Sequence, residues 1–237
     1  MPSTFAFISQ TGNVMKSTIA AAVGVTLADA GFSVLAVDLD PEHRDRGASL
    51  ATWLEERRER HPSRTQVPVA QPRTAAEALD IIRTTPAEIV LIDCPSRATE
   101  ASALIAAGCD FTVLPLVPGE KDARLTTWTL DMLTEAGIDP RRLAVLLTRT
   151  GSDSEAEDYK RLIGSQSFGG LPVNLVAAHI PERIAFRNAL TRRLVITEAQ
   201  PNTVGRAARK AIDALIEAYM RSTELDVEPP YHLEGAA

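Results

Sequence analysis

A short stretch near the start of the sequence carries residue types that bind phosphate. The segment QTGNVMKST lies between an apolar run, TFAFIS, and a small-residue stretch, STIAAAVGVTLADA, that is typical of a helix. Between a strand and a helix, main-chain N–H groups point at anionic oxygens. A lysine there adds a point charge, and a following Ser or Thr ligates magnesium. Lys16, Ser17 and Thr18 fit these roles, although the general loop pattern has glycine where this chain has Gln10 and Met15.

Carboxylates follow two further apolar runs. FSVLAVDLD ends on Asp38 and Asp40, and AEIVLIDCP contains Asp93. Side chains two residues apart share one face of a strand, so Asp38 and Asp40 can point at the same site. The three acids can therefore share one site if the strand ends meet at the same edge of the sheet.

Alternating strand and helix patterns predict how these groups come together. Helices are predicted over 17–30, 45–60, 74–85, 98–108, 121–136, 153–163 and 203–221, and strands over 4–9, 32–40, 87–95, 109–118, 143–150 and 174–181. Gly31 is expected to end the first helix and Thr74 to cap the third. Such alternation gives an α/β fold with a doubly wound, mostly parallel sheet flanked by helices. Ligands of these sheets bind at the carboxyl ends of the strands, which here are 9–18, 38–46, 93–97, 115–122, 149–152 and 179–187.

The composition is that of an ordinary globular protein. The chain has 237 residues, 45% hydrophobic and 24% charged, which excludes collagen-like, disordered and disulfide-scaffold classes. Two cysteines, Cys94 and Cys109, are expected to be reduced thiols. No apolar run is long enough to span a bilayer, and the N-terminus lacks the basic leader of a signal peptide. We therefore expect a cytoplasmic protein.

Charge is distributed unevenly along the sequence. The net charge is −6, which argues against a general nucleic-acid binder. Between Pro181 and Arg221, however, the sequence contains eight basic residues and only four acidic ones. This excess predicts a local basic face, and the alternative is a solvated, charged surface on two helices. Seven of these residues are candidates for DNA binding: Arg183, Arg187, Arg192, Arg193, Arg206, Arg209 and Lys210.

Several segments, taken in order, resemble the ParA/MinD family of deviant Walker-type P-loop ATPases. FISQTGNVMKST, VLAVDLDP and IVLIDCP match its phosphate loop, its D-x-D-P strand exit and its D-C-P strand. DLDPEHRDRGASLATW is similar to the small plasmid-partition ParA proteins. TVLPLVPGEKDA and HIPERIAFRNALTRRLVITEAQP resemble later segments of the same family. The resemblance covers the chain from about Thr4 to about Met220.

The resemblance implies a role for each matching residue. Residues 11–18 (Thr11, Gly12, Asn13, Val14, Met15, Lys16, Ser17 and Thr18) would bind the nucleotide. Lys16 would contact the β- and γ-phosphates, and Asp40 would position the attacking water, as the catalytic pair. Ser17 and Asp93 would hold magnesium, and Asp38 would support the magnesium shell and the loop. The implied cofactors are ATP and Mg²⁺.

The chain departs from the family pattern at three loop positions. Thr11 replaces the signature lysine that reaches a partner subunit's nucleotide, and Asn13 and Met15 replace glycines. Glycine allows positive φ and a close approach of the backbone to phosphate, and Asn tolerates that conformation better than Met does. Arg44 and Arg46 are candidates for a substitute cation. Two hypotheses remain open, a weak ATP hydrolase and a non-catalytic or nucleotide-binding-impaired scaffold that acts by protein interaction.

The resemblance also implies partners and an organisation of the chain. A ParA-like protein forms a homodimer in the ATP state, binds DNA non-specifically and works with a ParB-like or other cargo adaptor, here for plasmid partition. Residues 1–222 are expected to form a single domain, and 223–237 an acidic, flexible tail. An acidic, Pro-containing tail argues against the basic membrane helix of MinD-type relatives. The expected location is cytoplasmic, with nucleoid association through DNA. Cys94 lies beside Asp93, which argues against the iron–sulfur cluster of some relatives.

Overall fold

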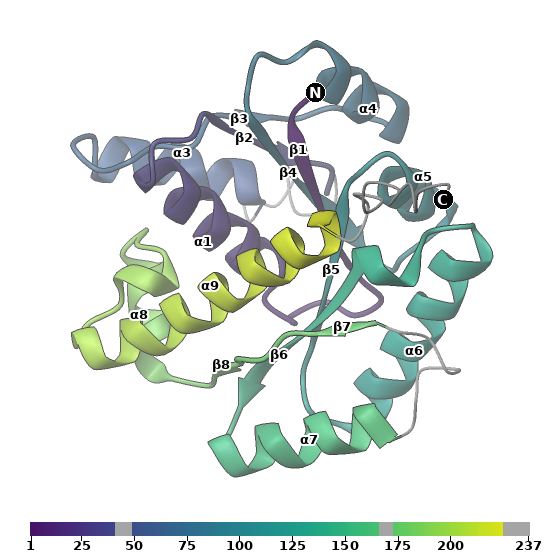
Figure 1. Ribbon diagram of the computed structural model, residues 1–237. Coiled ribbons are helices and arrows are strands. Elements are labelled where there is room, and N and C mark those ends of the chain that lie inside the picture. Colours follow the sequence, from purple (N-terminus) through teal and green to yellow (C-terminus); the bar gives the residue numbers. More distant parts are fainter. Residues whose placement is uncertain (41–48, 166–172, 225–237) are drawn as a thin grey trace, which may run out of the picture.

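The computed structural model describes residues 1–40, 49–165 and 173–224. Its centre is an eight-stranded parallel sheet of order β3-β2-β4-β1-β5-β6-β7, with β8 paired to β6 (Figure 1). The strands are β1 (Ser3–Ser9), β2 (Val34–Asp38), β3 (Val69–Ala70), β4 (Ile89–Ser96), β5 (Phe111–Leu116), β6 (Leu143–Thr150), β7 (Asn174–Leu175) and β8 (Ile180–Pro181). The predicted doubly wound parallel sheet is confirmed.

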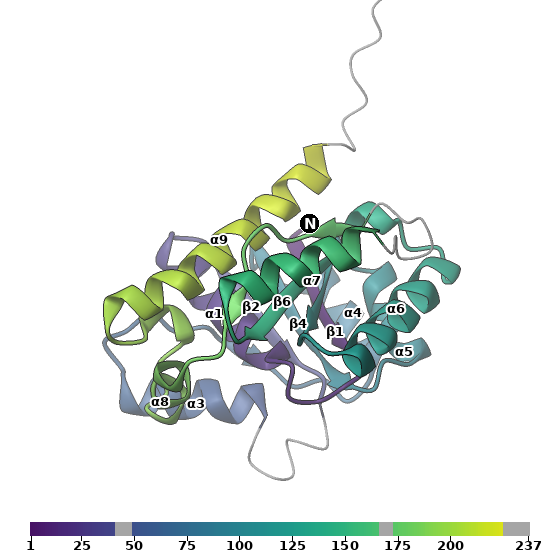
Figure 2. The same cartoon turned by 90° about the horizontal axis from the view of Figure 1, so that it is seen from below.

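Helices cover both faces of the sheet (Figures 1 and 2). One face carries α1 (Lys16–Asp29), α3 (Leu50–Arg60), α8 (Ile184–Thr191) and α9 (Asn202–Glu224). The other carries α4 (Ala75–Thr84), α5 (Glu100–Ala107), α6 (Glu120–Glu135) and α7 (Asp153–Ser165). Phe5 and Phe7 of β1 pack into the first layer, and Ala6 and Ile8 into the second. Because both faces are covered, the centre of β1 is a continuous apolar run from Phe5 to Ile8.

Local sequence signals explain where several helices begin. Ser49 caps α3 by accepting a hydrogen bond from the Thr52 amide, and Thr74 caps α4 by accepting one from the Glu77 amide, as predicted. Gly31, with φ of 98°, follows the end of α1. By contrast, no side chain of the described residues caps α1, whose N-cap residue is Met15. The N-terminal amides of α1 therefore lack the usual partner.

Some element boundaries differ from the sequence-based expectations. The strand predicted over 174–181 is two short strands, since the chain bends at Ala177, whose carbonyl accepts a hydrogen bond from Lys160 instead of from a neighbouring strand. Residues 62–72, between two predicted helices, contain the short strand β3. The helix α8 lies between β8 and α9, where the sequence predicts no helix. The helix predicted over 45–60 is described from Leu50, and 41–48 lie outside the described residues. Of the predicted tail, Thr223 and Glu224 belong to α9, and 225–237 lie outside the described residues.

None of the described helices is long and apolar enough to cross a membrane.

Candidate functional site

A cavity of about 270 Å³ lies where the carboxyl ends of the strands meet the start of α1. The order of the sheet reverses here, because the chain passes from β1 to β2 on one side and continues with β5 on the other. The cavity is lined by most of the predicted loop and carboxylate residues together with the β8–α8 segment: Thr11, Gly12, Asn13, Val14, Met15, Lys16, Ser17, Thr18, Asp40, Asp93, Arg149, Pro181, Glu182, Arg183, Phe186 and Arg187. The strand-exit argument therefore locates this cavity.

The loop between β1 and α1 has the backbone shape of an anion site although it lacks glycines. Asn13 and Met15 have φ of 64° and 70°, in the left-handed region. A turn that alternates in this way can aim successive amides at one anion. A left-handed conformation costs a non-glycine residue about 1–2 kcal/mol. Met15 packs against the core on the α1 side of the sheet, and this contact offsets part of that cost.

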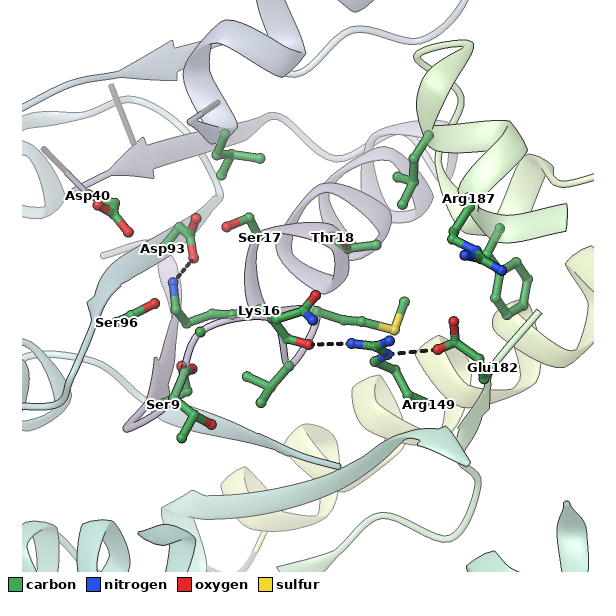
Figure 3. A pocket seen from close by; sticks show the side chains of 18 of the residues that line it. Ser9, Lys16, Ser17, Thr18, Asp40, Asp93, Ser96, Arg149, Glu182 and Arg187 are labelled. Atoms are coloured by element: carbon green, nitrogen blue, oxygen red, sulfur yellow. Dashed lines mark hydrogen bonds and ion pairs between the residues drawn. The ribbon is translucent and has the colours of Figure 1, made fainter. Parts of the chain in front are cut away.

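A buried ion pair lies at the base of the loop. Lys16 Nζ is 2.8 Å from Asp93 Oδ1, and the two side chains are 6% and 1% exposed (Figure 3). Burial raises the pKa of Asp93, and Lys16 and Ser17 only partly counter it. Burial alone would lower the pKa of Lys16, but the charge and hydrogen bond of Asp93, together with smaller contributions that include Asp40, outweigh it, so the pKa of Lys16 lies above its ordinary value. Lys16 is therefore a cation held at the cavity wall.

The donor set fits magnesium. Asp93 Oδ2 is buried and has no hydrogen-bond partner among the described residues, and the Ser17 hydroxyl lies beside this carboxylate (Figure 3). Hard oxygen donors of this kind suit Mg²⁺, which keeps several waters and binds through one or two protein oxygens together with phosphates. Within the described ranges no cluster of three or more His, Cys, Asp or Glu could hold a metal ion, so a dedicated all-protein metal cage is not found there.

The two acids after β2 have different environments. Asp38 is fully buried and accepts hydrogen bonds from the main-chain amides of Asp40 and Ala51, at 3.0 and 2.9 Å. It therefore ties together the chain on either side of residues 41–48. Asp40 lines the cavity and is 6% exposed. The position of Asp40 suits the predicted role in orienting water, whereas Asp38 acts on the loop backbone.

Thr11 is engaged by an acid on another element. Its hydroxyl donates to Asp122 Oδ1 at 3.0 Å, from the loop to the first turn of α6. At the position of the signature lysine, this chain therefore has an uncharged hydroxyl that is hydrogen-bonded to a carboxylate. Arg44 and Arg46, considered as substitute cations, lie outside the described residues.

Arg149, at the end of β6, is a residue to which the sequence analysis assigned no role. Its Nη1 donates to the Asn13 carbonyl at 3.1 Å, and its Nε donates to Glu182 Oε2 at 2.7 Å (Figure 3). The range 149–152 was among the strand exits to search, but a single arginine at a strand end carries no signal of a contact to a distant carbonyl. Arg149 is a cation in the cavity whose position is fixed by two partners.

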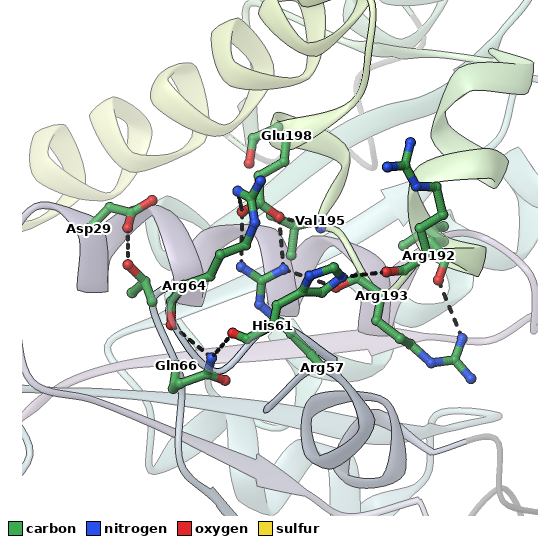
Figure 4. Close-up of polar contacts among 12 residues, drawn as sticks. Asp29, Arg57, His61, Arg64, Gln66, Arg192, Arg193, Val195 and Glu198 are labelled. Carbon is green, nitrogen blue, oxygen red and sulfur yellow. Dashed lines mark hydrogen bonds and ion pairs between the residues drawn. The ribbon is translucent and has the colours of Figure 1, made fainter. Parts of the chain in front are cut away.

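The predicted DNA-binding residues fall into three groups. Arg183 and Arg187 line the cavity. Arg193 forms an ion pair with Glu56, and Arg209 donates to the carbonyls of Thr197 and Asn202 (Figure 4 shows Arg192 and Arg193). Arg192, Arg206 and Lys210 form the third group, and they are exposed, as are Arg183, Arg187 and Arg209. Of the seven, only Arg193 is half-buried, so the set differs mainly in which side chains are already engaged by other groups.

Comparison with known proteins places the chain in a family. Residues 5–196 match the CobQ/CobB/MinD/ParA nucleotide binding domain. Similar solved structures include the Pyrococcus furiosus cell division ATPase MinD (20% identity, TM-score 0.66, covering 92% of this chain and 99% of that one) and a ParA family ATPase from Chlorobium tepidum (17%, 0.67, 91% and 99%). Another is the Pyrococcus horikoshii septum site-determining protein MinD complexed with Mg-ADP (18%, 0.61, 96% and 97%). No match is found among curated protein sequences.

These identities show the fold, and the matched domain spans well over half of the chain. The motifs, the parallel sheet and the loop at its switch point agree with that assignment. The resemblance inferred from the sequence is confirmed: the chain belongs to the CobQ/CobB/MinD/ParA family of nucleotide-binding domains.

Proposed function

We propose that this protein binds ATP with Mg²⁺ in the cavity at the carboxyl ends of the strands. The observation that carries the proposal is the Lys16–Asp93 pair, buried beneath a loop whose following helix has no side-chain cap. Burying an ion pair is costly, and an uncapped helix end leaves amides without partners, so both features are compensated by an anionic ligand. A relative of similar fold holds Mg-ADP, which supports the same ligand class here.

Each residue has a role in this proposal. Lys16 exchanges part of its contact with Asp93 for the β- and γ-phosphates, and the loop amides bind the phosphate oxygens. Ser17 and Asp93 are the residues that would hold Mg²⁺, with Asp38 supporting the chain around the site. Bound Mg²⁺ supplies neutralisation of phosphate charge. Asp40 orients the attacking water.

The wider function that we propose is that of a ParA-like ATPase, which forms a homodimer in the ATP state and positions cargo, with plasmid DNA as the expected cargo. Non-specific DNA binding would use the exposed Arg192, Arg206 and Lys210, because free cations replace counterions on phosphate. Arg183 and Arg187 would add to this surface from the cavity rim. A ParB-like or other adaptor protein would link the ATPase to cargo in the cytoplasm.

Binding of Mg-ATP to the wild type and to Lys16→Ala tests the nucleotide site. Removing the lysine is expected to weaken binding about 100-fold, on the scale of losing a charged contact to phosphate in a buried site. Lys121→Ala removes an exposed lysine on α6 that does not line the cavity, and it should bind like the wild type. If the wild type has no affinity, or if both variants match it, the nucleotide site is rejected.

A second candidate is a nucleotide-binding scaffold without turnover. The observation that favours it is the Thr11–Asp122 contact, which puts a hydroxyl where relatives in the sequence resemblance have a catalytic lysine. A cation supplied to the transition state is worth about 10³–10⁵ in rate in related phosphoryl transfer. Steady turnover by the wild type that Asp40→Ala abolishes would reject the scaffold. Absence of turnover, with ATP-dependent oligomerisation unchanged in Thr11→Lys/Met15→Gly, would support it.

A further inference from the structure

The end of β6 holds two consecutive carbonyl groups of the phosphate loop. The Thr148 hydroxyl donates to the Val14 carbonyl at 3.2 Å, and Arg149 Nη1 donates to the Asn13 carbonyl at 3.1 Å. Thr148 is fully buried, so its contact is sheltered from water. The loop is thus attached to a strand that lies two positions away from β1 in the sheet.

Peptide geometry makes these contacts relevant to anion binding. In a planar trans peptide the C=O and the following N–H point in opposite directions. Holding the carbonyls of Asn13 and Val14 towards β6 therefore turns the amides of Val14 and Met15 away from it. Asn13 and Met15, on either side of Val14, have positive φ, and a turn of this kind can aim successive amides at one anion.

The Arg149 side chain is itself held in place. Its Nε donates to Glu182 Oε2, and the Glu182 amide donates to the carbonyl of Thr150, which returns the contact to β6. Arg149 also has a left-handed backbone, with φ of 54°. Three non-glycine residues in strained conformations, Asn13, Met15 and Arg149, therefore meet at one cavity, and strain of this kind persists only where the surroundings enforce it.

We propose that Arg149, braced by Glu182, is a positioning residue that keeps the glycine-poor loop in its phosphate-binding shape. The inference rests on the proposed nucleotide site. In this proposal the contact from Arg149 stabilises the positive φ values that glycine would adopt without support. Arg149 acts through the Asn13 carbonyl. The role needs two nitrogens of one planar group, one for Glu182 and one for Asn13, which a lysine does not provide.

The test is a double-mutant cycle on Mg-ATP binding. Arg149→Gln and Arg149→Lys are each expected to weaken binding about ten-fold, since each loses the contact to the loop. In the glycine-restored background Asn13→Gly/Met15→Gly, Arg149→Gln should weaken binding less than about three-fold, because glycine adopts positive φ without support. As the control, Arg161→Gln removes an exposed arginine of α7. It should leave the affinity for Mg-ATP unchanged in both the wild-type and the glycine-restored background.

Two results would overturn the positioning role. Full affinity in Arg149→Lys would show that charge alone is sufficient, and an equal loss in both loop backgrounds would show that Arg149 and the loop are not coupled. Amide hydrogen exchange of the nucleotide-free protein gives a readout that does not depend on ATP. Arg149→Gln should speed exchange at Val14 and Met15 at least about five-fold relative to Arg161→Gln, because the loop loses an anchor. Unchanged exchange contradicts the proposal, whereas faster exchange in a protein that binds no ATP rejects only the nucleotide site.

Discussion

Two ion pairs in this molecule, each with a buried cation, differ in how completely their carboxylates are hydrogen-bonded. The Lys16–Asp93 pair at the cavity leaves Asp93 Oδ2 without a hydrogen bond from any residue in the ranges that the structure describes. The Arg57–Glu198 pair joins α3 to the segment before α9, and both oxygens of Glu198 are engaged, by Arg57, Arg64 and the Val195 amide (Figure 4). Arg57 also donates to the Arg193 carbonyl, and of its guanidinium only Nε has no partner in the described part of the chain.

This difference in hydrogen bonding indicates that the Arg57–Glu198 pair stabilises the fold, whereas the Lys16–Asp93 pair can bind a ligand. A buried network in which both carboxylate oxygens are paired fixes neighbouring elements but leaves no free acceptor for a metal ion or its water. A buried carboxylate oxygen without a partner carries a cost that a cation or its water removes. We therefore expect loss of the Arg57 contacts to destabilise the fold more, and a change at Asp93 to impair ligand binding with a smaller loss of stability.

The largest expected effect is on the structural pair. Arg57→Met should lower the free energy of unfolding by about 3–5 kcal/mol, because it leaves Glu198 without its main partner in a shielded position. Urea unfolding measures this, and Arg58→Met on the exposed side of α3 is the matched control. Equal stability of the two variants would show that the network contributes nothing.

The next effect is on the site pair. Asp93→Asn should weaken Mg²⁺-dependent ATP binding about 10–100-fold, the range found when a group orienting a metal is removed. Its loss of unfolding free energy should be smaller than that of Arg57→Met, since an uncharged Lys16 is an available alternative. Asp80→Asn, an exposed acid on α4, serves as control. A variant that binds normally in magnesium would contradict the role of Asp93.

A third prediction concerns pH. Burial raises the pKa of Glu198, but the Arg57 hydrogen bond and charge outweigh it, so this pKa lies below its usual value. A lowered carboxyl pKa contributes stability above the unfolded-state pKa, and that stability is lost as pH falls through the folded-state value. At neutral pH the free energy of unfolding of the wild type should exceed that of Glu198→Gln by about 2 kcal/mol. The gap should begin to narrow as pH falls below 4.5, the ordinary pKa of this side chain, and close as pH falls through the lower folded-state pKa.

Unfolding free energies from pH 7 down to pH 3 check this dependence, with Glu59→Gln, on the exposed side of α3, as the control. A gap between wild type and Glu198→Gln that stays constant with pH would mean that the Glu198 charge does not contribute.

The smallest expected effect is on DNA affinity, and it concerns two exposed basic residues of α9. Arg206 and Lys210 lie four residues apart on α9 and are exposed. Reversing both charges to Glu should weaken non-specific DNA binding about ten-fold and reduce the salt slope by about two, because two phosphate contacts are lost. The same change at Arg83 and Arg124, exposed on α4 and α6, should have no such effect. Identical salt slopes would remove α9 from the DNA-binding surface.

The sequence predicts the cavity but not its internal contacts. Because alternating strands and helices place the strand exits at one edge of the sheet, the sequence predicts that Lys16, Asp40 and Asp93 lie together. Arg57, in contrast, lies in the charged run LEERRER, where nothing marks one arginine as fully buried. Its burial depends on the packing of α3 against a segment 136 residues later, as in the contact to the Arg193 carbonyl.

The loop itself shows the same limit. Met15 in place of glycine predicts a disturbed cradle, yet the backbone keeps positive φ at Asn13 and Met15. The reason lies in contacts that local sequence does not reveal, to Thr148 and Arg149 on β6 and to Asp122 on α6. Tertiary contacts here override the conformational preference of a residue type.

A crystal structure with a non-hydrolysable ATP analogue and Mg²⁺ tests the central claim most directly. The account predicts phosphate oxygens within about 3 Å of the Val14 and Met15 amides and of Lys16 Nζ, with Arg149 still bonded to the Asn13 carbonyl. An empty cradle in which Lys16 remains paired only with Asp93 would contradict it.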